Sequence, residues 1–536
     1  MTETQDSKKN RGGYYTPSKL TDFIAKWAIS TPDAKILEPS SGDGRFVDSA
    51  YKVLQDFNAK FELDQILAVE YSESEALKIN KKKAKVINSD FFKLFQEDLK
   101  SKEKYDVILG NPPFIRYQSI EKEISDRAFD SMIYYGLRPS KMTNLWVPFL
   151  LLSCELLTDD GRLGMVIPSE LLQVDYAADI REYLLRKFSE LTVISFNDNL
   201  FENAQQEVVV LLGKRKSKDT GFRFIELNSL NDLDTIELDG VTEFVKDIEI
   251  SKEKWLKYFL KPDEISNFRL AISNNELKLF DDIAEVNVGV VTGQNNFFVV
   301  NKETIDYFNL KNDSFIDIIS RSEQLKGIEL NDSKLEELYI DNKKVKLFIP
   351  KIDLNPVEKN YIQFGESKGY HSGYKTRIRK EWYRVPVSWM PEAFFLRQVH
   401  EYPKIVVNKT GAINTDTLHK VRARSGFEIE NIALSFLNSL TLLQCELTGR
   451  SYGGGVLTFE PGEVRRIKVP YHNFDTTDRK KIMELLSDNK TEEAIEVIDD
   501  IVLKNKFNFS KQEILKFKSG WLRLKTRRLN RKKSRS

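Results

Sequence analysis

The sequence predicts an α/β fold built around a mostly parallel sheet. The first 115 residues contain four short apolar runs separated by segments compatible with helices. Each run ends at a side chain that can accept a hydrogen bond, and the first run leads into a Gly-rich turn. Such alternation is typical of βαβ units, in which helices cover both faces of a parallel sheet.

The four expected strands place their last side chains along one edge. They lie within residues 35–38, 66–70, 85–90 and 105–110. Ligands of open parallel sheets bind beyond the carboxyl ends of the strands. The sequence therefore predicts one crevice, lined by the residues that close these strands: Glu38, Glu70, Asp90 and Asn111.

The fourth run reads YDVILGNPPF and ends in the tetrad Asn111, Pro112, Pro113 and Phe114. The side-chain oxygen of Asn111 and the main-chain carbonyl of Pro112 can accept the two hydrogens of a planar amino group. Tandem prolines hold such acceptors in place, because the proline ring fixes φ. The tetrad thus indicates a rigid loop that grips an amino group beside an aromatic face.

These strand ends together resemble the motifs of an adenine-specific DNA amino-methyltransferase of the gamma class. Such enzymes use S-adenosylmethionine and carry a target-recognition domain after the cofactor motifs. Three further segments support the resemblance: GYYTP at 13–17, RLGMVIPS at 162–169 and NLFENAQQEVVVLL at 199–212. It implies a class I S-adenosylmethionine-dependent methyltransferase domain, Rossmann-like with a mostly parallel seven-stranded sheet. An α+β target-recognition domain and a helical basic tail would follow.

The resemblance also implies how the cofactor is held. The residues that it assigns to the cofactor are Tyr15, Thr16, Glu38, Ser40, Gly42, Gly44, Glu70, Asp90, Phe91 and Asn111. Glu70, at the end of the second strand, would accept both ribose hydroxyls. Asp90 would accept from the adenine amino group, and Glu38 with Thr16 would hold the methionine end. The glycines of the turn let the backbone approach the cofactor closely.

The reaction that the resemblance implies is methyl transfer to N6 of an adenine. This amine is a poor nucleophile, because its lone pair is delocalised into the ring. Two acceptors that pull its hydrogens toward a tetrahedral geometry localise that lone pair, so positioning and electrostatics suffice without a strong base. A base in a duplex must be flipped out and stacked to reach such a site. The implied catalytic set is Asn111, Pro112, Pro113, Phe114 and, as second stacking face, Phe201.

Length and composition limit the number of domains and of membrane-spanning helices that the chain can form. A chain of 536 residues with 41% hydrophobic composition can bury two substantial cores. We expect a catalytic domain at 1–240, a target-recognition domain at 250–475 and a helical basic segment at 476–536. The longest apolar stretch, 145–157, is too short to span a bilayer and is expected to form a buried helix.

Cysteine and histidine usage bears on compartment and metals. The two cysteines form no CxxC pair, and the four histidines show no ligand spacing. This favours a reducing cytoplasm and no metal. No charged-then-apolar leader opens the chain, so we expect a cytoplasmic protein whose first residues form a disordered arm.

The charged residues that give the net charge of +1 are distributed unevenly along the sequence. Residues 504–536 hold 13 Lys or Arg and one acid, Glu513, whereas the remainder holds 69 basic and 80 acidic residues and has a net charge of −11. A basic block favours phosphate contacts, which give salt-dependent affinity without sequence preference. A solubilising tail explains the block about equally well.

The second half contains segments suited to DNA contacts. Residues 286–300 predict a β-turn-β unit that resembles the opening of the recognition domain. Cations interleave with aromatics at 373–384, and polar residues or glycines gather at 407–422 and 449–470. The residues expected to contact DNA are Lys375, Arg377, Arg379, Lys409, Asn414, Tyr452 and Gly453. A charged solvated face explains any single segment about as well.

Double-stranded DNA is thus the expected substrate, methylated by a monomer. The expected setting is a restriction-modification system, whose endonuclease would form no stable complex with this chain. The tetrad chemistry also suits protein glutamine, RNA adenine or DNA cytosine amino groups, and these substrates stay open. A catalytically silent DNA-binding module is the alternative that involves no enzyme.

Overall fold

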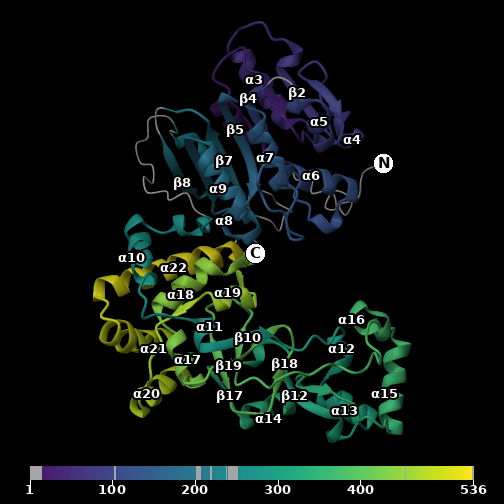
Figure 1. Cartoon of the computed structure of the whole chain (residues 1–536), viewed down its shortest axis with the longest axis vertical. Coiled ribbons are helices and arrows are strands. Elements are labelled where there is room, and N and C mark those ends of the chain that lie inside the picture. The colour runs from purple at the N-terminus through teal and green to yellow at the C-terminus, as the bar shows by residue number, and fades with distance from the viewer. Residues whose placement is uncertain are drawn as a thin grey trace. The chain divides into compact units, whose positions relative to one another are not determined.

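The computed structural model describes residues 15–101, 104–198, 200, 207–217, 220–236, 238, 252–452 and 454–533. These residues form two compact units: the first comprises the described residues up to Pro262 and those from Asn530 onward, and the second spans Asp263–Leu529. Figure 1 shows the first unit mainly in purple and blue, and the second in green and yellow. The domain boundary predicted at 240–250 falls on residues outside the described part of the chain.

An eight-stranded sheet forms the centre of the first unit, in the order β3-β2-β1-β4-β5-β7-β6-β8. Its strands are β1 (Ile36–Glu38), β2 (Ile66–Glu70), β3 (Lys85–Asn88), β4 (Tyr105–Gly110), β5 (Leu157–Pro168), β6 (Glu190–Phe196), β7 (Val208–Lys214) and β8 (Gly221–Leu227). Neighbours pair in parallel except for β7, which is antiparallel to β5 and β6. The sheet is mostly parallel, as predicted, and β8 extends the expected seven strands by pairing with β6.

Helices connect these strands. They are α2 (Ser18–Ala28), α3 (Arg45–Asp56), α4 (Glu73–Ala76), α5 (Phe91–Glu97), α6 (Lys122–Tyr134), α7 (Trp146–Glu155), α8 (Glu170–Gln173) and α9 (Ala178–Lys187). Helix α2 lies close to β5, since a Cβ at Gly164 would come within 2.4 Å of Ile24. Helix α7 is buried along nearly its whole length, which confirms the prediction for 145–157. None of the described helices is both long and apolar enough to cross a membrane.

The strand order places a topological switch point between β1 and β4. From β1 the chain builds outward through β2 to β3, then crosses back to add β4 on the other side of β1. Ile36 of β1 accordingly pairs with Ile66 on one side and Val107 on the other. The carboxyl ends of these four strands share one edge, where open sheets bind their ligands.

The second unit contains four smaller sheets, with strand orders β10-β19-β15-β17-β13, β11-β14-β12-β18, β16-β21-β20 and β22-β9. The strands are β9 (Lys278–Leu279), β10 (Ala284–Val288), β11 (Val299–Val300), β12 (Phe315–Ile319), β13 (Glu329–Leu330), β14 (Lys346–Phe348), β15 (Ala393–Leu396), β16 (Gln398–Val399), β17 (Ile405–Asn408), β18 (Ile413–Asn414), β19 (Leu418–Ala423), β20 (Arg450–Tyr452), β21 (Val456–Thr458) and β22 (Lys468–Val469). The mixed pairing and interspersed helices make this unit α+β, as predicted.

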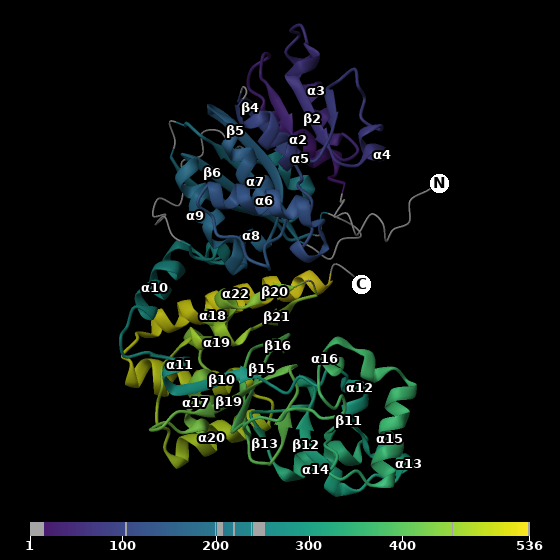
Figure 2. The ribbon, with the colours of Figure 1, turned by 45° about the vertical axis from the view of Figure 1, so that its right-hand side comes forward.

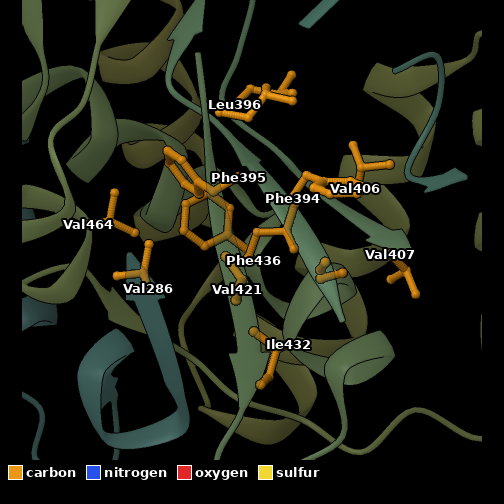
Figure 3. Close-up of a cluster of buried hydrophobic side chains, with 14 of the residues drawn as sticks. Val286, Phe394, Phe395, Leu396, Val406, Val407, Val421, Ile432, Phe436 and Val464 are labelled. Carbon is orange, nitrogen blue, oxygen red and sulfur yellow. The ribbon is translucent and has the colours of Figure 1, made fainter. Parts of the chain in front are cut away.

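Two hydrophobic cores stabilise the second unit. The larger surrounds the five-stranded sheet, and Figure 3 shows Phe395 and Phe436 within it, with ring centroids 5.7 Å apart. The smaller surrounds the four-stranded sheet and is rich in aromatic rings, such as Phe297 stacked on Tyr361 at 4.7 Å. The chain between these cores at 288–294 links β10 to α12 (Asn295–Phe298).

The other helices of this unit are α10 (Pro262–Ile272), α11 (Phe280–Ile283), α13 (Lys302–Phe308), α14 (Asp332–Ile340), α15 (Pro356–Ser367), α16 (Tyr374–Arg377), α17 (Ile429–Phe436), α18 (Ser439–Thr448), α19 (Pro461–Arg465), α20 (Thr476–Ser487), α21 (Thr491–Ile498) and α22 (Lys511–Lys533). The C-terminal segment is helical, as predicted. It is packed into the second unit, however, because α22 buries Phe517, Trp521 and Leu524. Figures 1 and 2 both show α22 running beside α18.

Candidate active site

A cavity of about 340 Å³ opens at the carboxyl edge of the first unit's sheet. The turn after β1, the ends of β2 and β4, and residues of the segment 115–124 contribute to its wall. The predicted cofactor residues that line it are Tyr15, Thr16, Glu38, Ser40, Gly42, Glu70, Asp90, Phe91 and Asn111. Residues from distant parts of the sequence therefore share one cavity, as the strand order requires.

The Gly-rich turn after β1 holds Glu70 in place. The backbone N–H of Gly42 donates to one carboxylate oxygen of Glu70 at 2.8 Å, and the N–H of Ser72 donates to the other at 2.8 Å. Gly42 and Gly44 have φ values of 52° and 85°, in the left-handed region that favours glycine. Gly44 does not itself line the cavity; it precedes α3 and packs against Ile79.

Glu38 is buried at the end of β1, with 3% of its surface exposed. Its Oε2 has no hydrogen-bond partner within the part of the chain that the structure describes. Burial, together with the negative charges of Glu70 and Asp43, raises the pKa of the Glu38 carboxyl well above its ordinary value. A carboxylate in this position destabilises the protein unless a ligand brings a donor or a positive charge. Glu38 thus indicates a cationic ligand group.

Asp90 follows β3 and caps α5. Its Oδ1 accepts from the N–H of Phe92 at 3.0 Å, and its Oδ2 accepts two hydrogen bonds from the guanidinium of Arg127, at 3.1 and 2.8 Å. A carboxylate oxygen can accept more than one hydrogen bond, so Asp90 retains capacity for a ligand. Sequence reasoning missed Arg127, because a single Arg in a helical segment carries no motif.

Phe91 supplies an apolar wall beside Asp90. Its side chain is 2% exposed, and its ring stacks on Phe149 with centroids 5.1 Å apart. Both rings line the cavity. Phe149 belongs to α7, which the sequence identified only as a buried helix.

Asn111 contacts two neighbours, one through its side chain and one through its main chain. Its Nδ2 donates to the Oγ1 of Thr16 at 3.2 Å, and its main-chain carbonyl accepts from the hydroxyl of Ser40 at 3.2 Å. Asn111 and Pro113 line the cavity. The 9% exposed Phe114 is not among the lining residues, and Phe201 lies outside the described part of the chain. Pro112 is buried.

The predicted DNA contacts divide into exposed and engaged side chains. Lys375 and Arg377 are exposed on α16. Arg379 instead donates to the carbonyl of Val291 at 2.8 Å, and burial lowers the pKa of its guanidinium. Lys409 forms an ion pair with Glu430.

Asn414 and Tyr452, two further residues predicted to contact DNA, lie on strands β18 and β20, and the prediction for Asn414 is corrected. Asn414 is 1% exposed, and its Nδ2 donates to the carbonyls of Thr415 and Leu418, so it stabilises the fold rather than facing a ligand. The polar run 407–422 that suggested it contains β18 and most of β19, so some of its polar side chains are buried in the sheets. Tyr452 lies on β20, and Gly453 lies outside the described residues.

Two family models match the chain. The model for N-6 DNA methylase matches residues 2–281, more than half of the 536 residues. The model for the C-terminal domain of Type II methyltransferase M.Eco57I matches residues 252–503. The two matches together span both structural units.

Individual relatives match most of the chain. Type II methyltransferase M.AccI from Acinetobacter calcoaceticus is 25% identical over 531 residues, covering 93% of this chain and 94% of the relative. M.XamI from Xanthomonas campestris pv. amaranthicola is 22% identical and covers 86% of this chain and 85% of its own length. A solved structure, the Type IIL restriction-modification enzyme MmeI in complex with DNA, shares the fold, with a TM-score of 0.60, 12% identity and coverage of 95% of this chain and 75% of that chain. The chain belongs to the N-6 DNA methylase family, and is a DNA adenine methyltransferase as its motifs predict.

Proposed function

We propose that this protein transfers a methyl group from S-adenosylmethionine to N6 of an adenine flipped out of double-stranded DNA. The observation that carries the proposal is the single cavity that joins Glu38, Glu70, Asp90 and Asn111. Each of these residues closes or follows a strand at the carboxyl edge of the sheet, so a nucleoside cofactor and an amino-group substrate can bind side by side there.

The cavity fits the cofactor group by group. Buried Glu38 would accept from the α-ammonium, which supplies the positive charge that its environment lacks. Glu70 would accept from the ribose hydroxyls while the N–H groups of Gly42 and Ser72 hold it in place. Asp90 would accept from the adenine amino group, with Phe91 against the ring. The bound cofactor supplies an electrophilic methyl group on a sulfonium.

The tetrad would prepare the adenine for that methyl group. The Asn111 side-chain oxygen and the Pro112 carbonyl accept the two amine hydrogens, so the nitrogen lone pair becomes localised and faces the cofactor side of the cavity. As the methyl group passes from the sulfonium to the nitrogen, the positive charge that develops on the amine would be stabilised by the same two acceptors. The methylated amine would then lose one proton to water. The ring of Phe114 would stack on the base, and Phe201 would cover its other face.

The second unit would bind the duplex. Lys375 and Arg377 are exposed on α16 beside exposed Tyr374 and Ile378, an arrangement suited to phosphates and adjacent sugars. The relatives named above are Type II methyltransferases, which supports a role as the modification enzyme of a restriction-modification system. We propose that it acts as a monomer. An endonuclease of that system would recognise the same DNA site without binding this chain.

The test is to incubate the protein with methyl-labelled S-adenosylmethionine and DNA of mixed sequence, and to map the modified bases by sequencing. We expect label at N6 of adenine within one recurring sequence. Label confined to cytosine, RNA or protein would overturn the proposal.

A pair of variants tests whether Asn111 in the cavity is required for methyl transfer. Asn111→Ala should lower the methyl-transfer rate at least 100-fold, in the range seen when one essential acceptor or donor is removed, while cofactor binding is retained. Asn231→Ala changes an exposed Asn of the same unit and should leave the rate unchanged. An active Asn111→Ala protein would refute the role given to the tetrad.

A further inference from the structure

A chain of polar contacts links the Gly-rich turn to the carboxamide of Asn111. Asp43 accepts from Nε of Arg45 at 3.1 Å, and Nη1 of Arg45 donates to the main-chain carbonyl of Thr16 at 3.1 Å. The Oγ1 of Thr16 then accepts from Nδ2 of Asn111 at 3.2 Å. We propose that Thr16 and Arg45 are positioning residues that fix the orientation of the Asn111 amide, an inference that rests on the proposed function.

The orientation matters because an amide has two unlike ends. Its oxygen accepts hydrogen bonds, whereas its NH₂ group donates them. If the Asn111 amide rotated by half a turn, it would present a donor to the donor hydrogens of the target amine. In this structure the Oγ1 of Thr16 accepts from Nδ2, and this contact places the NH₂ group of the amide against Thr16. The oxygen Oδ1 is then the atom that the proposed reaction uses.

The position of Thr16 is itself fixed. Its side chain is 4% exposed, and the guanidinium of Arg45 lies 5.2 Å from the ring centroid of the preceding Tyr15. Arg45 therefore holds Tyr15 through its ring and Thr16 through its carbonyl, while Asp43 holds Arg45. The five residues joined by these contacts all line the cavity: Tyr15, Thr16, Asp43, Arg45 and Asn111. A ligand that occupies the cavity therefore contacts the residues that orient the Asn111 amide.

This assignment gives Thr16 a different task from the one that the sequence motif suggested. A residue that only binds the cofactor affects cofactor affinity. A residue that orients Asn111 affects the rate of the chemical step when the cofactor is saturating. The two roles separate in the kinetics.

The experiment measures the single-turnover rate of adenine methylation and the cofactor KM for Thr16→Val, Thr16→Ser and the wild type. Thr16→Val keeps the shape but loses the acceptor, so we expect a rate about tenfold lower, equivalent to about 1.4 kcal/mol, with KM changed less than threefold. Thr16→Ser keeps a hydroxyl and should restore most of the rate. Thr21→Val, a buried Thr of α2 outside the cavity, is the matched control and should keep the wild-type rate.

Other outcomes would overturn the proposal. A Thr16→Val rate equal to wild type, a change confined to KM, or a loss of rate that Thr16→Ser does not rescue would each do so. If Thr16→Val fails to fold, Arg45→Met decides, with an expected fall in rate of about threefold and unchanged KM. A wild-type protein that methylates no adenine would instead remove the proposed function, so the two failures are distinguishable.

Discussion

Two buried glutamates show how the two units use charge differently. Glu38 in the first unit and Glu446 in the second are 3% and 5% exposed. Glu446 accepts from the guanidinium of Arg528 at 2.6 and 2.9 Å, whereas Oε2 of Glu38 has no hydrogen-bond partner among the described residues. Burial raises the pKa of both carboxyls; Arg528 opposes the rise at Glu446, and nearby acids add to it at Glu38. A buried charge with a partner is accommodated within a fold, whereas an unpaired one in a cavity indicates a ligand.

The same contrast changes the interpretation of the basic C-terminal block. Ion pairs join Lys516, Lys518, Arg523 and Arg528 of α22 to acids of the second unit. Arg528 also donates to the carbonyls of His400 and Gly455. Much of the block's charge is therefore engaged within its own unit. Truncation before Lys504 would remove part of a core, so it cannot report DNA affinity alone.

The largest expected effect comes from breaking the paired glutamate. Arg528→Ala leaves Glu446 buried without its cation and should destabilise the second unit by about 3–5 kcal/mol. The control Lys518→Ala removes a partly exposed pair with Glu496 and should change stability by less than about 1 kcal/mol. Urea denaturation, followed by the fluorescence of the six tryptophans of the chain, measures the stability of both variants. An equal loss in the free energy of unfolding for the two variants would contradict the difference drawn between a buried and a partly exposed ion pair.

Glu38→Gln should have two effects of opposite sign. A charge-assisted hydrogen bond to the cofactor ammonium is lost, so the cofactor Kd should rise at least tenfold, consistent with about 1.5–3 kcal/mol. The ligand-free protein should become more stable at pH 8 by about 1–3 kcal/mol, because a buried Gln carries no charge and takes up no proton on folding. Calorimetry measures the affinity and thermal unfolding measures the stability. Glu446→Gln should only destabilise, and a Glu38→Gln protein that behaves in the same way would show that Glu38 is structural.

The raised pKa of Glu38 also predicts a pH dependence. Because the folded pKa lies above the unfolded value, the stability contribution of this group is fully present below the unfolded pKa and is lost as pH rises through the folded pKa. Cofactor affinity should change in the opposite direction, since the ammonium prefers the ionised carboxylate. We therefore expect wild-type affinity to rise with pH through the folded pKa, and Glu38→Gln to lose this dependence. An identical pH profile in both proteins would exclude Glu38 as the ammonium ligand.

Asp90 is intermediate between the two glutamates, since it is paired with Arg127 and yet lines the cavity. Arg127→Met should weaken cofactor binding by about threefold to tenfold, the size of one hydrogen bond of about 1 kcal/mol. A cofactor analogue with hypoxanthine in place of adenine sharpens the test, because it lacks the amino group. Discrimination against this analogue should fall in the variant. Undiminished discrimination would mean that Arg127 does not position Asp90 for that amino group.

The smallest effect concerns exposed charge in the second unit. Replacing Lys375 and Arg377 together with Ala should weaken DNA binding modestly at low salt, and reduce the slope of log affinity against log salt by about 2, one for each phosphate contact. Lys409→Ala is the control, because Glu430 already pairs with that cation. Filter binding at several salt concentrations measures all three proteins. A changed recognition sequence would instead assign α16 to base contacts.

Part of this structure was predictable because the signals were local. The strands that end at Glu38, Glu70 and Asn111 follow from apolar runs closed by polar residues, and the tetrad follows from four adjacent residues. The contact between Asp90 and Arg127 was not predictable, because it joins residues 37 positions apart on separate elements. The burial of Asn414 was not predictable either, because the sequence does not show whether a polar side chain contacts solvent or a buried carbonyl.

The sequence by itself determined the order of the strands' polar ends and predicted the acceptors in the tetrad, because hydrophobic periodicity and proline stiffness act over a few residues. Only the tertiary structure decided which charges would be paired. Burial and the distances between side chains depend on how β1, β4 and α22 each pack within their own unit. This packing determines whether a buried carboxylate is paired within the fold, as Glu446 is, or has an oxygen without a partner among the described residues, as Glu38 has, and can bind a ligand.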